Sequence, residues 1–208
     1  MADYAKAKEV YKELREALGP WTKANGFRKW PGTAAGWQRP QNASELLRFM
    51  FEVSVWGDSE TGNSLTGRVQ TDPSPGDLSA TPIRQDLFTS CLIGLELDRL
   101  AAIQGAINRR RPALPAQYKK DVSADTVLGL HLRELYDPSP KYQEGQHVPL
   151  SYYGIDDVRE WTRFIVEVLP AVLDRYVAGN TPRFIDTTPE HLKPKWLRDY
   201  PKNILKKD

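Results

Sequence analysis

The chain has 208 residues, of which 40% are hydrophobic and 27% are charged, and its formal net charge is only +2. This composition excludes wholesale disorder, and so small a net charge gives no global field that favours nucleic acid or a membrane surface. The single cysteine excludes an intramolecular disulfide, and no apolar run approaches the roughly 20 residues that a membrane-spanning helix needs. We therefore expect a globular cytoplasmic protein without a membrane partner.

The first half of the chain predicts one helix followed by a group of strands. Residues 2–24 have the three- and four-residue apolar spacing of an amphipathic helix, which Gly19-Pro20 should interrupt. Short strands are predicted at 27–30 and 36–39, on either side of a Pro-Gly turn, and a further strand at 65–71. Together with the long strand between them, these segments would form an antiparallel meander.

Residues 46–56 (LLRFMFEVSVW) are the best candidate for that central strand. Side chains of a strand point alternately to two faces, and one of the faces here is wholly apolar. That face consists of Leu47, Phe49, Phe51, Val53 and Val55. Burying one large apolar side chain contributes roughly 1.5–3 kcal/mol, so we expect the fold to be organised around this strand.

The next part of the chain predicts a loop, a helix and another strand. Residues 72–82 are rich in Pro, Ser, Gly and Asp and should form a loop. Helical spacing favours a helix over 96–110, which Pro112 and Pro115 should end. Residues 126–136 alternate apolar and polar side chains and predict a strand.

A short strand or an extended connection is expected at 148–152, and a long helix over 157–176 follows it. Val158, Trp161, Ile165, Val168, Val172 and Tyr176 give this helix its apolar stripe. Asp157 should cap the helix together with Glu160, and Pro170 should kink it or split it in two.

These elements predict a single α+β domain over residues 1–180. An antiparallel β-sheet meander would be packed on one face by the N-terminal and C-terminal helices, which suits strands with one clean apolar face. In residues 181–208 prolines alternate with charged side chains, which indicates a C-terminal extended arm.

The sequence contains no motif for catalysis, metal binding or nucleotide binding. His131, His147 and His191 have no partner at metal-ligand spacing, and a strand would point His131 and Glu134 to opposite faces. Cys91 lies in an apolar run without a nearby base, which is typical of a buried, inert thiol. We therefore predict no catalytic residue, no metal site and no cofactor.

Positive charge is concentrated in two windows that contain no acid, one between Glu16 and Glu45 and one between Asp98 and Asp121. Their basic residues are Lys23, Arg28, Lys29 and Arg39 in the first window and Arg99, Arg109, Arg110, Arg111, Lys119 and Lys120 in the second. Basic groups beside aromatic ones can bind a phosphate backbone or an acidic protein. The predicted binding residues are Arg28, Lys29, Arg109, Arg110, Arg111, Lys119 and Lys120.

The three consecutive arginines are expected at the surface, because the segment Pro112-Ala113-Leu114-Pro115 should hold the chain extended after them. Replacing all three by alanine should then leave folding nearly intact. The alternative is that they end a helix, where the helix dipole favours cations.

Four short motifs follow one another in an order that suggests a relative. They are the turn Gly26-Phe27-Arg28-Lys29, the aromatic strand Gly36-Trp37-Gln38-Arg39, the apolar strand 46–56, and the segment Tyr152-Tyr153-Gly154-Ile155, which leads into a helix with Trp161. This arrangement resembles a bacterial family catalogued as domain of unknown function 4304, over residues 5–178. The resemblance implies an α+β fold and a bacterial, intracellular setting, and it implies no catalytic residues.

Two functions from different classes are consistent with these observations. The first is a non-enzymatic binding protein whose partner is another protein, such as an immunity- or antitoxin-like inhibitor. The alternative is a protein that binds or processes nucleic acid through the two acid-poor windows, which would then have to converge on one face. An enzyme of another type is the third hypothesis.

Overall fold

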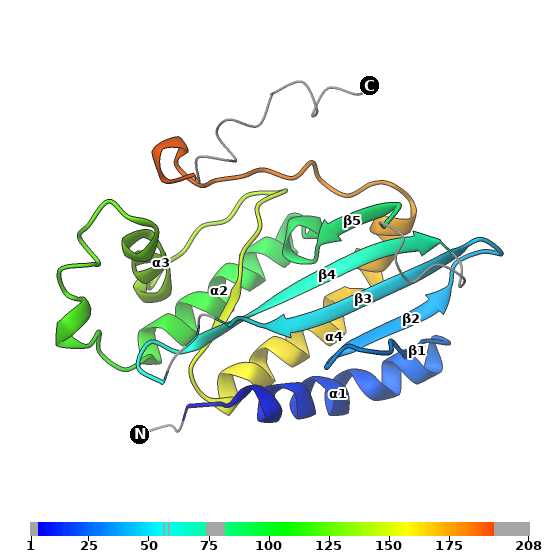
Figure 1. Ribbon diagram of the computed structural model, residues 1–208, viewed down its shortest axis with the longest axis horizontal. Coiled ribbons are helices and arrows are strands. Elements are labelled where there is room, and N and C mark those ends of the chain that lie inside the picture. Colours follow the sequence, from blue (N-terminus) through cyan, green and yellow to red (C-terminus); the bar gives the residue numbers. More distant parts are fainter. Residues whose placement is uncertain (1–3, 56, 58, 74–81, 194–208) are drawn as a thin grey trace.

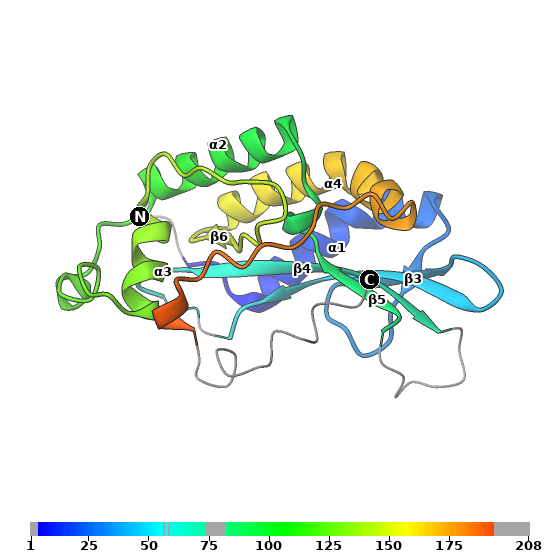
Figure 2. The ribbon, with the colours of Figure 1, turned by 90° about the horizontal axis from the view of Figure 1, so that it is seen from above.

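The computed structural model describes residues 4–55, 57, 59–73 and 82–193. In this part of the chain an antiparallel sheet is covered on one face by three long helices (Figure 2). Apolar side chains of the sheet and of the helices form one hydrophobic core between the two layers. The predicted α+β class, with N-terminal and C-terminal helices on one face of an antiparallel meander, is confirmed.

The sheet is a meander with one added strand. Its strands are β1 (Arg28–Lys29), β2 (Gly36–Pro40), β3 (Glu45–Val53), β4 (Asn63–Pro73), β5 (Arg84–Leu87) and β6 (Leu150–Tyr152). The first five pair in chain order, each antiparallel to the next, and β6 pairs with the beginning of β4. β4 extends two residues into the predicted loop, of which residues 74–81 lie outside the described part. The sequence-based prediction missed β5, because its residues RQDL lack apolar alternation.

Two of the helices contain a proline and nevertheless continue through it. The helices are α1 (Ala7–Ala24), α2 (Leu95–Arg110), α3 (Val127–Tyr136) and α4 (Ile155–Val177) (Figure 1). The predicted interruption of α1 at Pro20 is wrong, and α4 is not split at Pro170. A proline removes one N–H donor from the helix. The helix continues because the buried side chains Leu14, Leu18 and Thr22, on both sides of Pro20, pack α1 against the core.

Asp157 does not have the capping position that the sequence suggested. α4 begins two residues before it, and Asp157 Oδ2 accepts hydrogen bonds from the N–H groups of Tyr153 (2.8 Å) and Gly154 (3.1 Å). A carboxylate in the first turn is favoured because it satisfies N–H groups that have no partner within the helix. The helix start is therefore fixed by Asp157 from within its first turn.

The helix-facing side of β3 supplies the centre of the core. Leu47, Phe49 and Phe51 are at most 1% exposed. Val53 is half-buried, and Val55 is 87% exposed because β3 has already ended. The apolar face of the central strand is thus confirmed for its first three members and does not extend to Val55.

The segment 126–136, predicted as a strand, instead forms the helix α3 (Val127–Tyr136) with Thr126 as its N-cap. The residues buried along this segment are Gly129, Leu132 and Leu135, which recur every three residues. The Thr126 hydroxyl accepts the N–H of Gly129 at 3.0 Å and caps the first turn. The alternating leucines therefore suggested the wrong period, because Leu128 is 45% exposed and does not belong to the core.

The described part of the predicted C-terminal arm, residues 181–193, lies against the body of the protein. The N–H of Ile185 donates to the carbonyl of Gly145 at 2.8 Å, and Gln146 forms an isolated parallel bridge with Ile185. A short 3-10 turn follows at Glu190–Leu192. The remainder of the predicted arm, 194–208, lies outside the described residues.

Replacing Phe51 by Asp should abolish the cooperative unfolding transition. Phe51 is 1% exposed and packs edge-to-face against Phe88, with 5.3 Å between ring centroids. An unpaired charge at such a site costs several kcal/mol. Val55→Asp is the control, since its exposed position predicts a change of about 0.5 kcal/mol or less. Urea unfolding followed by circular dichroism measures both, and a Phe51→Asp midpoint near that of the parent would contradict the β3 assignment.

Candidate functional site

The structure gives the arginines at the end of α2 partners within the protein. Arg110 Nη2 lies 2.6 Å from Asp157 Oδ1 and 3.0 Å from Glu160 Oε2, both on α4. Burial opposes the charge of Arg110, but the hydrogen bonds to Glu160 and Asp157 outweigh it and raise the pKa of the guanidinium. Arg109 donates from Nη1 to the carbonyl of Pro138 at 2.6 Å. Both arginines lie in the last turn of α2, as the helix-end alternative requires.

Arg111 is buried, so the expectation that it is presented at the surface is wrong. Only 7% of the residue is exposed, and Nη1 donates to the carbonyl of Thr61. Nε and Nη2 have no hydrogen-bond partner among the described residues. Burial lowers the pKa of this guanidinium, because the charged form loses its hydration. Arg111 holds the segment before β4 against the end of α2.

In the second window Arg109 is exposed and belongs to no ion pair in the described part of the chain. The same holds for Lys119 and Lys120. They follow the 3-10 turn Ala116–Tyr118. Arg99 is paired with Glu167 of α4. Two of the six cations of the second window, Arg99 and Arg110, are therefore neutralised by acids that are distant in sequence.

The first window is arranged differently, and its cations gather where α1 ends and the sheet begins. Lys23 lies in the last turn of α1, and Arg28 and Lys29 form β1, where both are exposed. Arg39 on β2 donates from Nη1 to the carbonyl of Asn25 at 3.1 Å. We call Lys23, Arg28, Lys29 and Arg39 the basic corner.

Strand register places the cations of the basic corner on both sides of the sheet edge. Arg28 pairs with Gln38 and Lys29 with Trp37, and successive strand residues point to opposite faces. The Arg39 guanidinium is stacked 4.7 Å above the centroid of the Phe27 ring, so its position is fixed by a buried aromatic side chain.

No carboxylate neutralises the basic corner within the described residues. None of the ion pairs in this part of the chain includes any of its four side chains. The predicted binding residues Arg28 and Lys29 thus lie in an uncompensated positive surface, together with Lys23 and Arg39. This is the candidate binding site of the protein.

The two acid-poor windows do not converge. β1 and the end of α1 lie at one end of the longest axis, whereas the segment after α2, with Lys119 and Lys120, lies at the other end (Figure 1). The view from above has the same arrangement (Figure 2). The fold therefore offers two separate groups of exposed cations and no single basic face that includes both.

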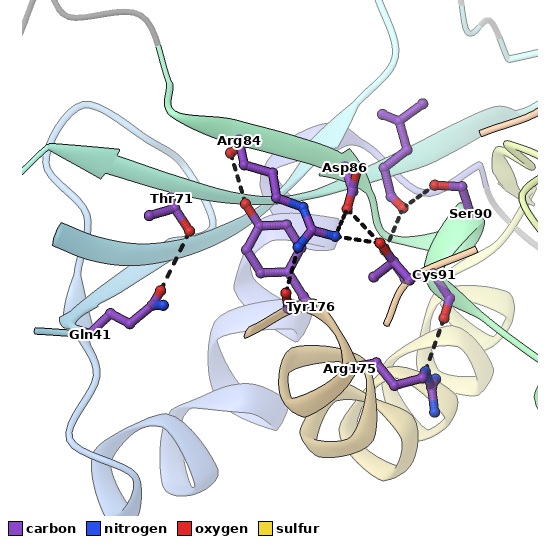
Figure 3. A network of polar contacts seen from close by, with 10 residues as sticks. Gln41, Thr71, Arg84, Asp86, Ser90, Cys91, Arg175 and Tyr176 are labelled. Carbon is purple, nitrogen blue, oxygen red and sulfur yellow. Dashed lines mark hydrogen bonds and ion pairs between the residues drawn. The ribbon is translucent and has the colours of Figure 1, made fainter. Parts of the chain in front are cut away.

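A further arginine, Arg84 on β5, belongs to a network of polar contacts within the protein (Figure 3). Its Nη1 donates to the carbonyl of Tyr176 at 2.8 Å, its Nη2 lies 2.8 Å from Asp86 Oδ2, and its guanidinium is 4.3 Å above the Tyr176 ring. Arg84 Nη2 also donates to the hydroxyl of Thr181. This network ties β5 to the end of α4 and to the arm.

The other groups that the sequence singled out offer no reactive centre among the described residues. Cys91 is fully buried, and burial, assisted by the charge of Asp86, raises the pKa of its thiol to about 12. His191 lies 2.8 Å from Asp125 on the surface. His131 and Glu134 are three residues apart on α3 and share a face, contrary to the strand prediction. No three His, Cys, Asp or Glu side chains come together as a metal site in the ranges described.

Sequence reasoning missed the acids that neutralise Arg110. Asp157 is 47 positions away along the chain, and no local pattern connects an arginine at a helix end with the first turn of another helix. For Lys23 and Arg39, the signal was the acid-free window itself, which includes both residues. They belong with Arg28 and Lys29 because β1, β2 and the end of α1 meet.

Comparison with protein-family models, with curated proteins and with solved structures finds no match to this chain. The resemblance to domain of unknown function 4304 therefore stays a prediction. No helix in the described ranges is long and apolar enough to cross a membrane.

Replacing Arg110 by Gln should lower the free energy of unfolding by about 1–2 kcal/mol, because Asp157, which is 5% exposed, loses its charged partner. The Arg110 side chain is 41% exposed, so water screens the pair and the loss of stability is smaller than for a fully buried pair. Arg109→Gln is the control and should change stability by about 0.5 kcal/mol or less. Urea denaturation measures both, and equal midpoints for the two variants would show that the Arg110 pairs contribute nothing.

Cys91 should not react with a thiol reagent in the folded protein at pH 8. The thiol is buried, its pKa is about 12, and it donates to the carbonyl of Leu87 at 3.3 Å. Modification should therefore occur at the rate of unfolding and become immediate in denaturant. Absorbance of the released chromophore measures the rate, and fast stoichiometric labelling of the native protein would contradict the burial of Cys91.

Proposed function

We propose that this chain is a non-enzymatic binding protein that recognises an acidic surface on a partner protein through the basic corner. An immunity- or antitoxin-like inhibitor is a protein of this kind. The observation that carries the proposal is the uncompensated charge of Lys23, Arg28, Lys29 and Arg39 at one end of a well-packed body.

The side chains of the basic corner are suited to carboxylate recognition. Arg28 and Arg39 each have a planar guanidinium fork, which can donate two parallel hydrogen bonds to one carboxylate. Arg39 is held by the Asn25 carbonyl and the Phe27 ring, so little side-chain entropy remains to be lost on binding. Lys23 and Lys29 add charge that can accelerate encounter with an acidic partner.

The separation of the two windows favours a protein partner over nucleic acid. A nucleic-acid surface of the kind considered above would need both windows on one face, and they lie at opposite ends of the molecule (Figure 1). The cations of the basic corner come from one strand pair and the adjoining end of α1, which matches a local acidic patch better than a long phosphate backbone.

There is also a purely structural explanation for two of these residues. β1 is an edge strand of the sheet. Cations on an edge strand can prevent further strands from pairing with it. This explanation includes Arg28 and Lys29, but it gives no role to Lys23, which lies on α1.

The binding proposal predicts that a variant with Lys23→Gln, Arg28→Gln and Lys29→Gln binds an acidic peptide about tenfold more weakly than the parent. Three exposed charges at about 0.5 kcal/mol each give this factor. The probe is a fluorescent peptide of ten glutamates, titrated by anisotropy at low salt. The control variant, with Lys8→Gln, Lys119→Gln and Lys120→Gln, has the same net charge and should retain most of the affinity.

Equal weakening by the two triple variants would mean that only net charge matters, and it would overturn the basic corner as the site. A duplex DNA titration distinguishes the alternative. Tighter binding to DNA than to the peptide, with a log–log salt slope near −0.9 per neutralised phosphate and a contribution from both triple variants, would favour nucleic acid.

A further inference from the structure

Two cavities adjoin α3, and the second has the more apolar lining. The first, here called the polar cavity, has a volume of about 130 Å³ and lies between α2, the end of α3 and the connection to β6. Among its lining residues are Glu134, Asp137, Lys141, Tyr142 and His147. Tyr142 also packs against the core, and none of these side chains belongs to the basic corner.

Two carboxylates contribute negative charge to the polar cavity, whose lining is otherwise mixed. The Glu134 carboxylate forms no hydrogen bond or ion pair within the described residues, and Asp137 uses one oxygen to accept the N–H of Ser139 at 2.9 Å. Burial, followed by the charges of Glu134 and Asp137, raises the pKa of Tyr142. Lys141 is the one cation among the lining residues, so the two carboxylates outnumber it.

His147 adds a neutral imidazole to this environment. The Thr89 hydroxyl accepts the N–H of Val148 at 3.0 Å and lies 3.2 Å from His147 Nδ1, so its own proton is available for that nitrogen. Burial and then the nearby Arg68 lower the pKa of His147, which favours the neutral ring.

The second cavity is an apolar groove of about 640 Å³ between α3 and the beginning of β4. Its apolar wall includes Val127 and Leu128, which are 62% and 45% exposed. His131, Leu135 and Pro149 line both the groove and the polar cavity. Residues four apart on a helix lie on one face, so α3 presents a continuous wall from the groove to the polar cavity.

We propose that this face of α3 is a binding site for a small organic amine, with the ammonium group in the polar cavity and an apolar substituent in the groove. The site is separate from the basic corner and does not depend on the protein-binding proposal. A cavity of about 150 Å³ can hold a benzene molecule, so the polar cavity is large enough for an ammonium group with its first carbons. The groove has the volume range and the apolar lining that are usual for small-molecule sites.

The charge part of the proposal is tested with hexylamine as the probe and 1-hexanol as its neutral counterpart. Two-dimensional NMR titration of the full chain should give saturable shifts around α3, with hexylamine bound at least tenfold more tightly than hexanol. Glu134→Gln should weaken hexylamine binding at least tenfold. Asp98→Asn is the matched control, because it removes one exposed carboxylate elsewhere and should leave the affinity unchanged.

The apolar part is tested by changing the groove. Leu128→Ser should weaken hexylamine binding several-fold and leave binding of ethylamine, which has only two carbons, unchanged. Leu95→Ser, at a position 80% exposed on α2, is the control. Circular dichroism melting shows that each variant is folded.

Saturable binding with this pattern supports the site. Lack of saturable hexylamine binding, equal affinity for hexanol, or unchanged affinity in Glu134→Gln would overturn it. Equal weakening of ethylamine and hexylamine by Leu128→Ser would overturn the assignment of the groove to the apolar substituent.

Discussion

The contact on which the other elements depend is the aromatic packing around Phe49 on β3. Its ring lies 5.2 Å from both Trp37 of β2 and Phe27 before β1, and 6.4 Å from Trp21 of α1. One side chain therefore connects the sheet edge, the central strand and the first helix. Offset and edge-to-face aromatic pairs stabilise a core beyond the area that they bury. The position of Arg39 in the basic corner depends on this packing, because its guanidinium stacks on the Phe27 ring.

Arginine has two different roles in this protein. Where a guanidinium meets carboxylates or carbonyls of another element, as Arg84 and Arg110 do, it joins segments that are distant in sequence. Where no ion pair forms among the described residues, as at Arg28, the same side chain is available to a partner. The number of arginines in a segment is therefore a poor guide to its binding capacity, and the distribution of acids in the folded protein decides the matter.

The end of the molecule around α3 differs from the rest of the body. The three other helices lie on the sheet, whereas α3 stands at one end and leaves cavities beside it (Figure 2). Carboxylates, a tyrosine and a histidine line the smaller of these cavities. Burial raises the pKa values of Glu134 and Tyr142 and lowers the pKa of His147, because protein atoms replace water around them. A helix with so little buried surface can present side chains that a core helix would have to pack.

The sequence by itself determined the α+β class, the strand β3 with its apolar face, and the helices α1, α2 and α4, because periodic burial of apolar side chains leaves a local pattern. It also identified the acid-free window that became the basic corner. It could not predict α3, since Leu128, Leu130 and Leu132 fit a strand until Leu135 and the Thr126 cap are known to determine the period. Nor could it predict the burial of Arg111 or the pairing of Arg110, because both depend on segments 47 or more positions away. Only the tertiary structure decided which charges are compensated, because compensation requires proximity in space and leaves no periodic signal in the chain.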